Sequence, residues 1–136
     1  MIRPIMKDVL FLSQKSEPAT REDLQVGTDL RDTLAANRDR CVGMAANMIG
    51  IKKRGIIVNI GMADVVMFDP VILSKDTPYE AEEGCLSLAG TRKTTRYENI
   101  QVEFYNMKWK KQQLKLSGWP AQICQHEIDH LEGILI

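Results

Sequence analysis

Long apolar runs are absent from this sequence of 136 residues. None approaches the roughly 18 residues that a membrane-spanning helix requires, and Arg3 and Lys7 interrupt the N-terminal segment, which has no signal-peptide core. Net charge is absent too, because 18 basic residues balance 18 acidic ones, so the chain has no broad positive field for nucleic acid. We therefore expect a soluble, cytoplasmic protein whose partners are neither a membrane nor nucleic acid.

Cysteine is scarce, with Cys41, Cys85 and Cys124 making an odd count. A chain of this length can bury enough surface to fold without disulfides, so the three are better explained as thiols, which can serve as ligands or nucleophiles. Repeats, low-complexity runs and Gly/Ser linkers are also missing. With 44% apolar and 26% charged residues, residues 1–136 are predicted to form a single domain around one core.

The pattern that is present predicts helices near both ends of the chain. Apolar residues recur at helical spacing from Leu24 onward, and Thr20 with Asp23 has the spacing of a capping box, so a helix is predicted from about residue 21 to about 37 or 38. Gly27 opposes this helix, because glycine inside a helix costs about 1 kcal/mol relative to alanine. Pro120 suits the first turn of a second helix that continues to Gly133.

Between the helices, short β-branched and aromatic runs predict strands at 55–60, 64–68, 71–73, 100–105 and 112–116. The last two are expected to pair as a hairpin across residues 107–111, with one face exposed to water. Strands without regular helical crossovers indicate an α+β fold. We expect short antiparallel sheets around the C-terminal helix, with the N-terminal helix packed on the outside.

Both histidines of the chain lie in one motif, His-Glu-x-x-His, at residues 126–130. Positions four apart lie on one face of a helix, so His126 and His130 can bind one cation at about 2.0–2.1 Å each. Glu127 is turned by about 100° from His126 and can reach a water on that cation. This arrangement is typical of metal-assisted hydrolysis. The alternative is a surface helix with two unrelated histidines, which the many apolar residues around the motif disfavour.

Two imidazoles do not complete a metal site, and the third ligand is expected upstream. Glu132 lies on a different side of the helix from His130, and Cys124, about 200° from His126, is better explained as a small core residue. Cys41 and Cys85 remain as candidates.

Cys85 is the favoured ligand because it lies in the segment Glu-Gly-Cys-Leu-Ser at 83–87, where Gly84 permits close backbone approach. The alternative is a buried apolar thiol. A Cys-His-His set leaves one tetrahedral position for water, and the cation lowers the pKa of that water towards neutrality.

Three segments in this order, 42–46 (Val-Gly-Met-Ala-Ala), 83–87 and 125–130, resemble the peptide deformylase family, and the resemblance covers nearly the whole chain. This family is a class of metallohydrolases that removes the formyl group from the N-terminal formylmethionine of nascent chains and releases formate. The resemblance implies one divalent metal ion held by Cys85, His126 and His130. Fe(II) is expected, and Zn, Ni or Co also suit a thiolate with two imidazoles. Its partners would be N-formylmethionyl peptides, met at the ribosome exit.

The resemblance also implies roles for other residues. Glu127 would take a proton from the attacking water and pass it to the departing amine. The backbone N–H of Leu86 would face the developing oxyanion. Val42 and Gly84 match positions whose backbone groups pair with the substrate peptide as an added strand, and Gly43 is placed with them as substrate-binding.

The first motif departs from the family pattern Gly-x-Gly-x-Ala-Ala-x-Gln, since Cys41 replaces the opening glycine and Met48 replaces the glutamine. In the family that glutamine donates a second hydrogen bond to the oxyanion, which a thioether cannot do. Losing one such donor costs about 10²–10³ in turnover. The departure leaves two interpretations, a deformylase slowed by Met48 or a catalytically impaired paralogue that binds metal and peptide N-termini. A zinc endopeptidase would follow from His-Glu-x-x-His alone, but the downstream third ligand is missing.

Two arginines, Arg92 and Arg96, follow the cysteine segment. Either could pair with the carboxylate of Glu83 or contact the substrate chain, and both could equally be ordinary surface residues. The sequence leaves this choice open.

Overall fold

The computed structural model describes residues 1–85 and 88–135. Five strands form one sheet in the order β1-β2-β3-β4-β5, with every neighbouring pair antiparallel. The elements, in chain order, are α1 (Val9–Leu12), the 3₁₀ turn η1 (Arg21–Asp23), α2 (Leu24–Ala36), β1 (Gly43–Ala45), the 3₁₀ turn η2 (Ala46–Ile49), β2 (Gly55–Asn59), β3 (Asp64–Cys85), β4 (Leu88–Tyr105), β5 (Lys111–Ser117) and α3 (Trp119–Leu131).

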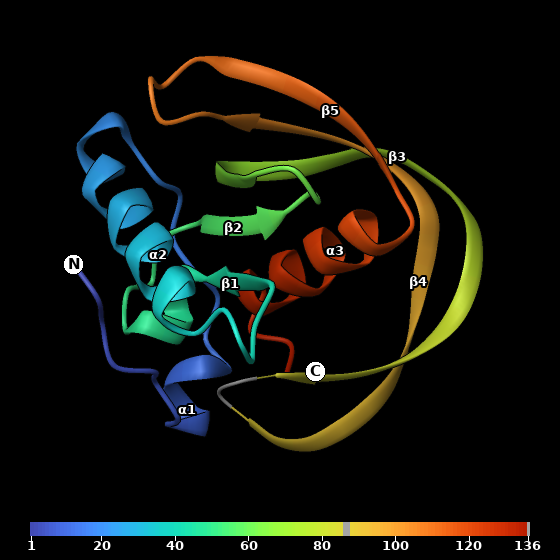
Figure 1. Cartoon of the computed structure of the whole chain (residues 1–136), viewed down its shortest axis with the longest axis horizontal. Helices are drawn as coiled ribbons and strands as arrows, with labels where there is room; N and C mark the ends of the chain where they lie inside the picture. Colours follow the sequence, from blue (N-terminus) through green and yellow to red (C-terminus); the bar gives the residue numbers. More distant parts are fainter. Residues whose placement is uncertain (86–87, 136) are drawn as a thin grey trace.

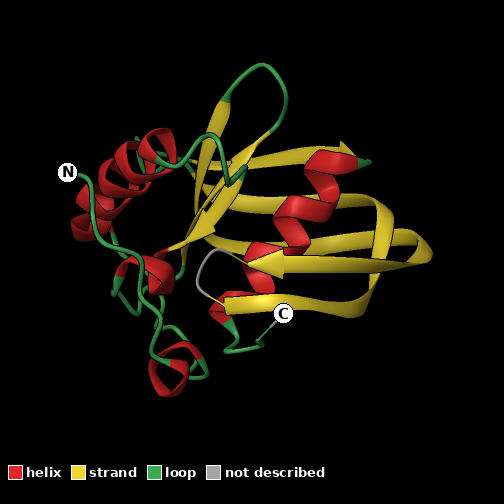
Figure 2. Cartoon of the chain, turned by 60° about the horizontal axis from the view of Figure 1, so that its bottom comes forward, coloured by secondary structure: helices red, strands yellow, loops and turns green. Residues whose placement is uncertain are grey.

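The sheet curves around α3, and α2 lies outside it, so that β2 is between the two helices (Figure 1). Figure 2 shows the same arrangement from another side, with the N-terminal segments gathered beyond the sheet. The predicted α+β class, with antiparallel strands around the C-terminal helix, is confirmed. No helix in the described part of the chain is long and apolar enough to cross a membrane.

The strands are longer than the sequence predicts. The expected strands 64–68 and 71–73 are both parts of β3, which has 22 residues, and 100–105 is the end of β4, which has 18. A register shift between Phe68 and Val71 interrupts the pairing and explains why the pattern looked like two strands. Most residues of 73–82 are exposed, so this part of β3 has no alternation of apolar and polar residues to mark it.

The predicted first helix is present as η1 followed by α2, and it begins with the expected capping box. The carboxylate of Asp23 accepts the N–H of Thr20 at 2.8 Å, and the hydroxyl of Thr20 accepts the N–H of Glu22 at 3.3 Å. Gly27 is buried in α2, where an added Cβ would lie 2.3 Å from Sδ of Met107. The glycine that opposed the helix is therefore explained by close packing against the sheet.

The predicted hairpin is also present, with Tyr105 of β4 opposite Lys111 of β5. Its inner face buries Val102 and Phe104, while Gln101 and Gln113 share a hydrogen bond on the exposed face. The hairpin therefore has one buried apolar face and one solvent-exposed polar face, as expected.

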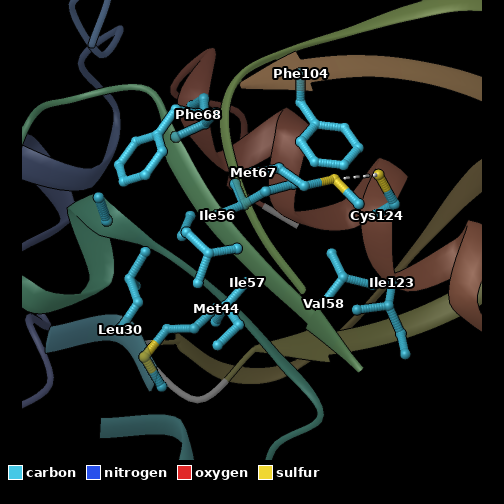
Figure 3. Close-up of a cluster of buried hydrophobic side chains, with 14 of the residues drawn as sticks. Leu30, Met44, Ile56, Ile57, Val58, Met67, Phe68, Phe104, Ile123 and Cys124 are labelled. Carbon is cyan, nitrogen blue, oxygen red and sulfur yellow. Dashed lines mark hydrogen bonds between the residues drawn. The ribbon is translucent and has the colours of Figure 1, made fainter. Parts of the chain in front are cut away.

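The core lies on both sides of β2, against α3 on one side and against Leu30 and Leu34 of α2 on the other. Ile123 and Cys124 of α3 point towards Val58 of β2 and Met67 of β3 (Figure 3). Cys124 is fully buried with its Sγ 4.0 Å from Sδ of Met67, and burial raises the pKa of its thiol to about 12. The prediction that Cys124 is a core residue is confirmed.

The end of α3 packs against the N-terminal segment through Gly133. This residue has φ +78°, and an added Cβ would lie 2.4 Å from the backbone oxygen of Ser13. We expect Gly133→Ala to lower the free energy of unfolding by about 2–4 kcal/mol, from the left-handed backbone and the collision together. Urea denaturation measures this loss.

Gly90→Ala is the matched control, because Gly90 has φ +79° and open space around the added Cβ. It should lose only the backbone contribution of about 1–2 kcal/mol. Equal losses in the two variants would contradict a rigid contact between Gly133 and Ser13.

Candidate active site

The two histidines converge from one face of α3. Nε2 of His126 lies 3.0 Å from Nε2 of His130, with the ring centroids 4.6 Å apart. His126 is 8% exposed and His130 is completely buried. Pro120 is in the first turn of α3, and Cys124, about 200° around the helix from His126, packs into the core against Met67.

These residues fit a divalent cation. One ligand atom from each of His126, Glu127 and His130 can be chosen so that all lie within 4.8 Å of one another. Two nitrogens bonded at 2.0–2.1 Å in a tetrahedral site would be roughly 3.3 Å apart, close to the separation seen. Burial and the neighbouring charges of His126 and Arg96 lower the pKa of His130 to about 3, which keeps its ring neutral, as a metal ligand must be.

Glu127 is buried beside the histidines. Its Oε1 has no hydrogen-bond partner among the described residues. Burial raises the pKa of Glu127 to about 7, against the opposing effect of His126. A carboxyl with a pKa near neutrality can both accept and donate a proton, which general acid–base catalysis requires.

Gly43 of β1 leaves the space that Glu127 occupies. An added Cβ would lie 2.4 Å from Cγ2 of Ile123 and 3.1 Å from Oε2 of Glu127. The close approach of β1 to α3 therefore depends on glycine at this position.

A buried ion pair stands behind His126. The carboxylate of Glu83, on β3, lies 2.8 Å from Nδ1 of His126 and accepts hydrogen bonds from Arg96 at 2.7 and 2.9 Å. Burial alone would raise the pKa of Glu83, but the hydrogen bonds from His126 and Arg96 outweigh it and lower the pKa to about 2. A charged carboxylate here fixes the ring so that Nε2 faces His130.

Of the two arginines left open by the sequence, Arg96 is the one that pairs with Glu83. It is 3% exposed and also donates to Oδ2 of Asp129 at 2.6 Å. Arg92 is opposite Glu83 in the strand register but remains exposed. Asp129 was not predicted as a partner of Arg96, and no local pattern could have indicated it, because the contact joins β4 to α3.

Two residues of the predicted site remain, Cys85 and Leu86. Cys85 is the last residue of β3, in register with Leu88, but its side chain lies outside what the structure describes, as does Leu86. The metal-ligand role of Cys85 and the oxyanion role of Leu86 therefore stay predictions. Glu132, which was excluded as a ligand, accepts a hydrogen bond from Arg54 at 3.0 Å.

A cavity of about 280 Å³ opens beside His126. Val42, Gly43 and Gly84 all line it, together with His126 and Glu127. The carbonyl of Val42 accepts the N–H of Asn59 at 3.0 Å. β1 is the edge strand of the sheet, so only one of its two sides is paired with a strand among the described residues. An extended peptide could therefore be added beside it.

Both departures from the family motif lie at this cavity. Met48 lines it and is 1% exposed, and its sulfur accepts the N–H of Ala45 at 3.4 Å. Cys41 also lines the cavity, with its Sγ 2.6 Å from the carbonyl oxygen of Gly43. The side chain at 48 therefore brings no hydrogen-bond donor to the cavity.

Comparisons with known proteins point to one family and match nearly the whole chain. A family model described as polypeptide deformylase matches residues 2–136. A peptide deformylase of Clostridium beijerinckii is 56% identical over 136 residues, the full length of both chains. Among solved structures, a class I type b peptide deformylase from Acinetobacter baumannii covers 99% of this chain and 97% of its own, with a TM-score of 0.89 and 32% identity. The peptide deformylase from Thermotoga maritima covers 99% and 95%, with a TM-score of 0.88 and 30% identity.

Proposed function

Because the chain belongs to the peptide deformylase family, we propose that it removes the formyl group from the N-terminal formylmethionine of nascent peptides and releases formate. The observation that carries this proposal is the convergence of His126 and His130 beside the buried carboxyl of Glu127. The chain is a metallohydrolase that requires one divalent metal ion. The impaired-paralogue interpretation is not favoured, because a relative named peptide deformylase is 56% identical over the full length.

Cys85, His126 and His130 are proposed to hold the metal. When bound, a divalent ion polarises the formyl carbonyl and lowers the pKa of water beside it. Fe(II) is the proposed ion, with Zn, Ni or Co as alternatives, because a thiolate and two imidazoles suit all four and availability decides among them. Anaerobic purification followed by elemental analysis identifies the ion. Activity that falls on exposure to air supports iron, since Fe(II) and a ligand thiolate are oxidised, and unchanged activity supports zinc.

Other residues of the chain are proposed to transfer protons, to stabilise the oxyanion and to bind the peptide. Glu127 accepts a proton from the attacking water and then donates it to the departing amine, which its pKa of about 7 permits. The backbone N–H of Leu86 stabilises the oxyanion. The backbone groups of Val42 and Gly84 bind the peptide as an added strand, with Gly43 beside them in the substrate site, so that recognition depends mainly on the peptide main chain.

The substrates are proposed to be N-formylmethionyl peptides met at the ribosome exit in the cytoplasm. The test is formate release from a formylated tripeptide that begins with methionine, by protein purified and assayed without oxygen. We expect formate to be released in proportion to enzyme concentration. A metal-loaded preparation that releases none at high concentration would overturn the proposal, and cleavage of an unformylated protein would revive the endopeptidase interpretation.

Met48 is expected to limit the rate, and Met48→Gln should raise it. Glutamine restores an amide donor to the cavity at nearly the same side-chain volume, so we expect kcat/KM to increase by about 10²-fold. Met62→Gln is the matched control, since Met62 is 92% exposed and should leave kcat/KM unchanged. An active parent that gains nothing from glutamine would show that the oxyanion needs no side-chain donor. If neither the parent nor Met48→Gln releases formate, the impaired-paralogue interpretation would be supported instead.

A further inference from the structure

We propose that Gln122 is a positioning residue that connects the substrate cavity to the metal ligand His126 through Glu83, and that Tyr79 holds Gln122 in place. The inference deepens the proposed function, from which it takes the roles of the cavity and of His126. Neither Gln122 nor Tyr79 was singled out by the sequence.

The contacts begin on α3. Gln122 lies one helical turn before His126 and therefore on the same face of the helix. Its Nε2 donates to Oε2 of Glu83 at 2.9 Å, while Oε1 of the same carboxylate lies 2.8 Å from Nδ1 of His126. The side chain of Gln122 also lines the cavity. The Glu83 carboxylate therefore contacts both Gln122, which lines the cavity, and His126, the proposed metal ligand.

Tyr79, on β3, gives the amide oxygen of Gln122 a hydrogen-bond donor. Its hydroxyl donates to Oε1 of Gln122 at 3.2 Å. A flipped amide would turn its oxygen towards the carboxylate of Glu83, where two acceptors would face each other, and its NH₂ towards the phenol. Burial raises the pKa of Tyr79, which keeps the proton that this hydrogen bond needs. The carboxylate of Glu83, which can only accept, therefore selects the amide orientation, and Tyr79 holds Gln122 in it by donating to the amide oxygen.

Gln122 and Arg96 act on Glu83 in different ways. Arg96 supplies the charge that keeps the carboxylate ionised and bonds to both of its oxygens. Gln122 adds no charge but gives Oε2 a second donor from α3 itself, the helix that carries His126. Because the terminal torsion of glutamate is broad, a carboxylate without this donor remains charged but turns more freely. The ring of His126 is then oriented less firmly, which weakens metal binding.

The test measures Zn(II) affinity by competition with a chelator of known affinity. Gln122→Leu removes the amide at similar size and should weaken Zn(II) binding about 10-fold, with kcat reduced more than KM is changed. Tyr79→Phe should weaken it less, about 3-fold. If Tyr79 acts through Gln122, the double variant binds Zn(II) no more weakly than Gln122→Leu alone.

Two further measurements separate positioning from general damage. In the metal-free protein, the Nδ1–H proton of His126 should exchange with water faster in Gln122→Leu than in the parent, as NMR would show. Tyr105→Phe is the matched control for Tyr79→Phe, because the Tyr105 ring stacks on Trp109, with ring centroids 4.6 Å apart, whereas Tyr79 bonds Gln122. It should leave Zn(II) affinity unchanged.

Unchanged Zn(II) affinity in Gln122→Leu would overturn the inference, whether or not the parent releases formate. Losses that add in the double variant would overturn the part assigned to Tyr79. A parent that binds Zn(II) but releases no formate would overturn the proposed function alone. Should Gln122→Leu fail to fold, Tyr79→Phe alters the same contact from a half-buried phenol, and its Zn(II) affinity then decides the outcome.

Discussion

Replacing Glu127 by glutamine is expected to lower the rate of formate release by about 10⁴-fold. The magnitude is at the upper end for general acid–base catalysis because one carboxyl serves in both proton transfers, and an amide can perform neither. The cavity geometry should persist, since glutamine has the same shape and Gly43 still leaves room for it. Steady-state assays of formate production measure the loss.

The metal content of Glu127→Gln should match that of the parent, because Glu127 is expected to transfer protons and not to hold the ion. Its stability should not fall, since burial disfavours the charged carboxylate that the substitution removes. Glu132→Gln is the matched control, because Glu132 lies just beyond α3 and pairs with Arg54 away from the cavity. A Glu127→Gln rate within tenfold of the parent would assign the proton transfers to another group.

The largest loss of stability is expected from Arg96→Met. Arg96 is 3% exposed and bonds both Glu83 and Asp129, so its removal leaves the carboxylate of Glu83 buried without its cationic partner. Removing one partner of a buried ion pair costs about 3–5 kcal/mol of folding free energy. Urea denaturation of the metal-free protein measures this loss without any contribution from metal binding.

Arg92→Met is the matched control, since Arg92 lies on the same strand, opposite Glu83 in register, but is exposed. We expect a change within about 0.5 kcal/mol. Combining Arg96→Met with Glu83→Gln should recover part of the stability, because the uncompensated charge is gone. A loss below about 1 kcal/mol in Arg96→Met would mean that water reaches the pair.

The arrangement of the site explains why the ion pair bears on catalysis as well as on stability. Arg96 keeps Glu83 charged, and Glu83 lies against the ring of His126 at 2.8 Å. On the opposite side of α3 from His126, Cys124 is fully buried in the core against Met67. Stability and metal binding are therefore expected to decline together when this network is cut.

Local features of the molecule could be predicted from the sequence by itself. The His-Glu-x-x-His spacing correctly predicted that His126 and His130 share one face of a helix. The spacing of Thr20 and Asp23 correctly predicted where the first helical segment begins. Cys124 was placed correctly in the core by its angle from His126. These predictions succeed because helical geometry relates residues a few positions apart, whatever surrounds them.

Only the tertiary structure decided which distant groups meet. Arg92 and Arg96 have the same character in the sequence, and Arg92 is even opposite Glu83 in the strand register, yet it is the Arg96 side chain that pairs with Glu83 and Asp129. The sequence likewise could not show that Gly27 is required by packing against Met107. Such contacts depend on the twist of the sheet and on how neighbouring side chains pack. Neither can be read from the spacing of residues along the chain.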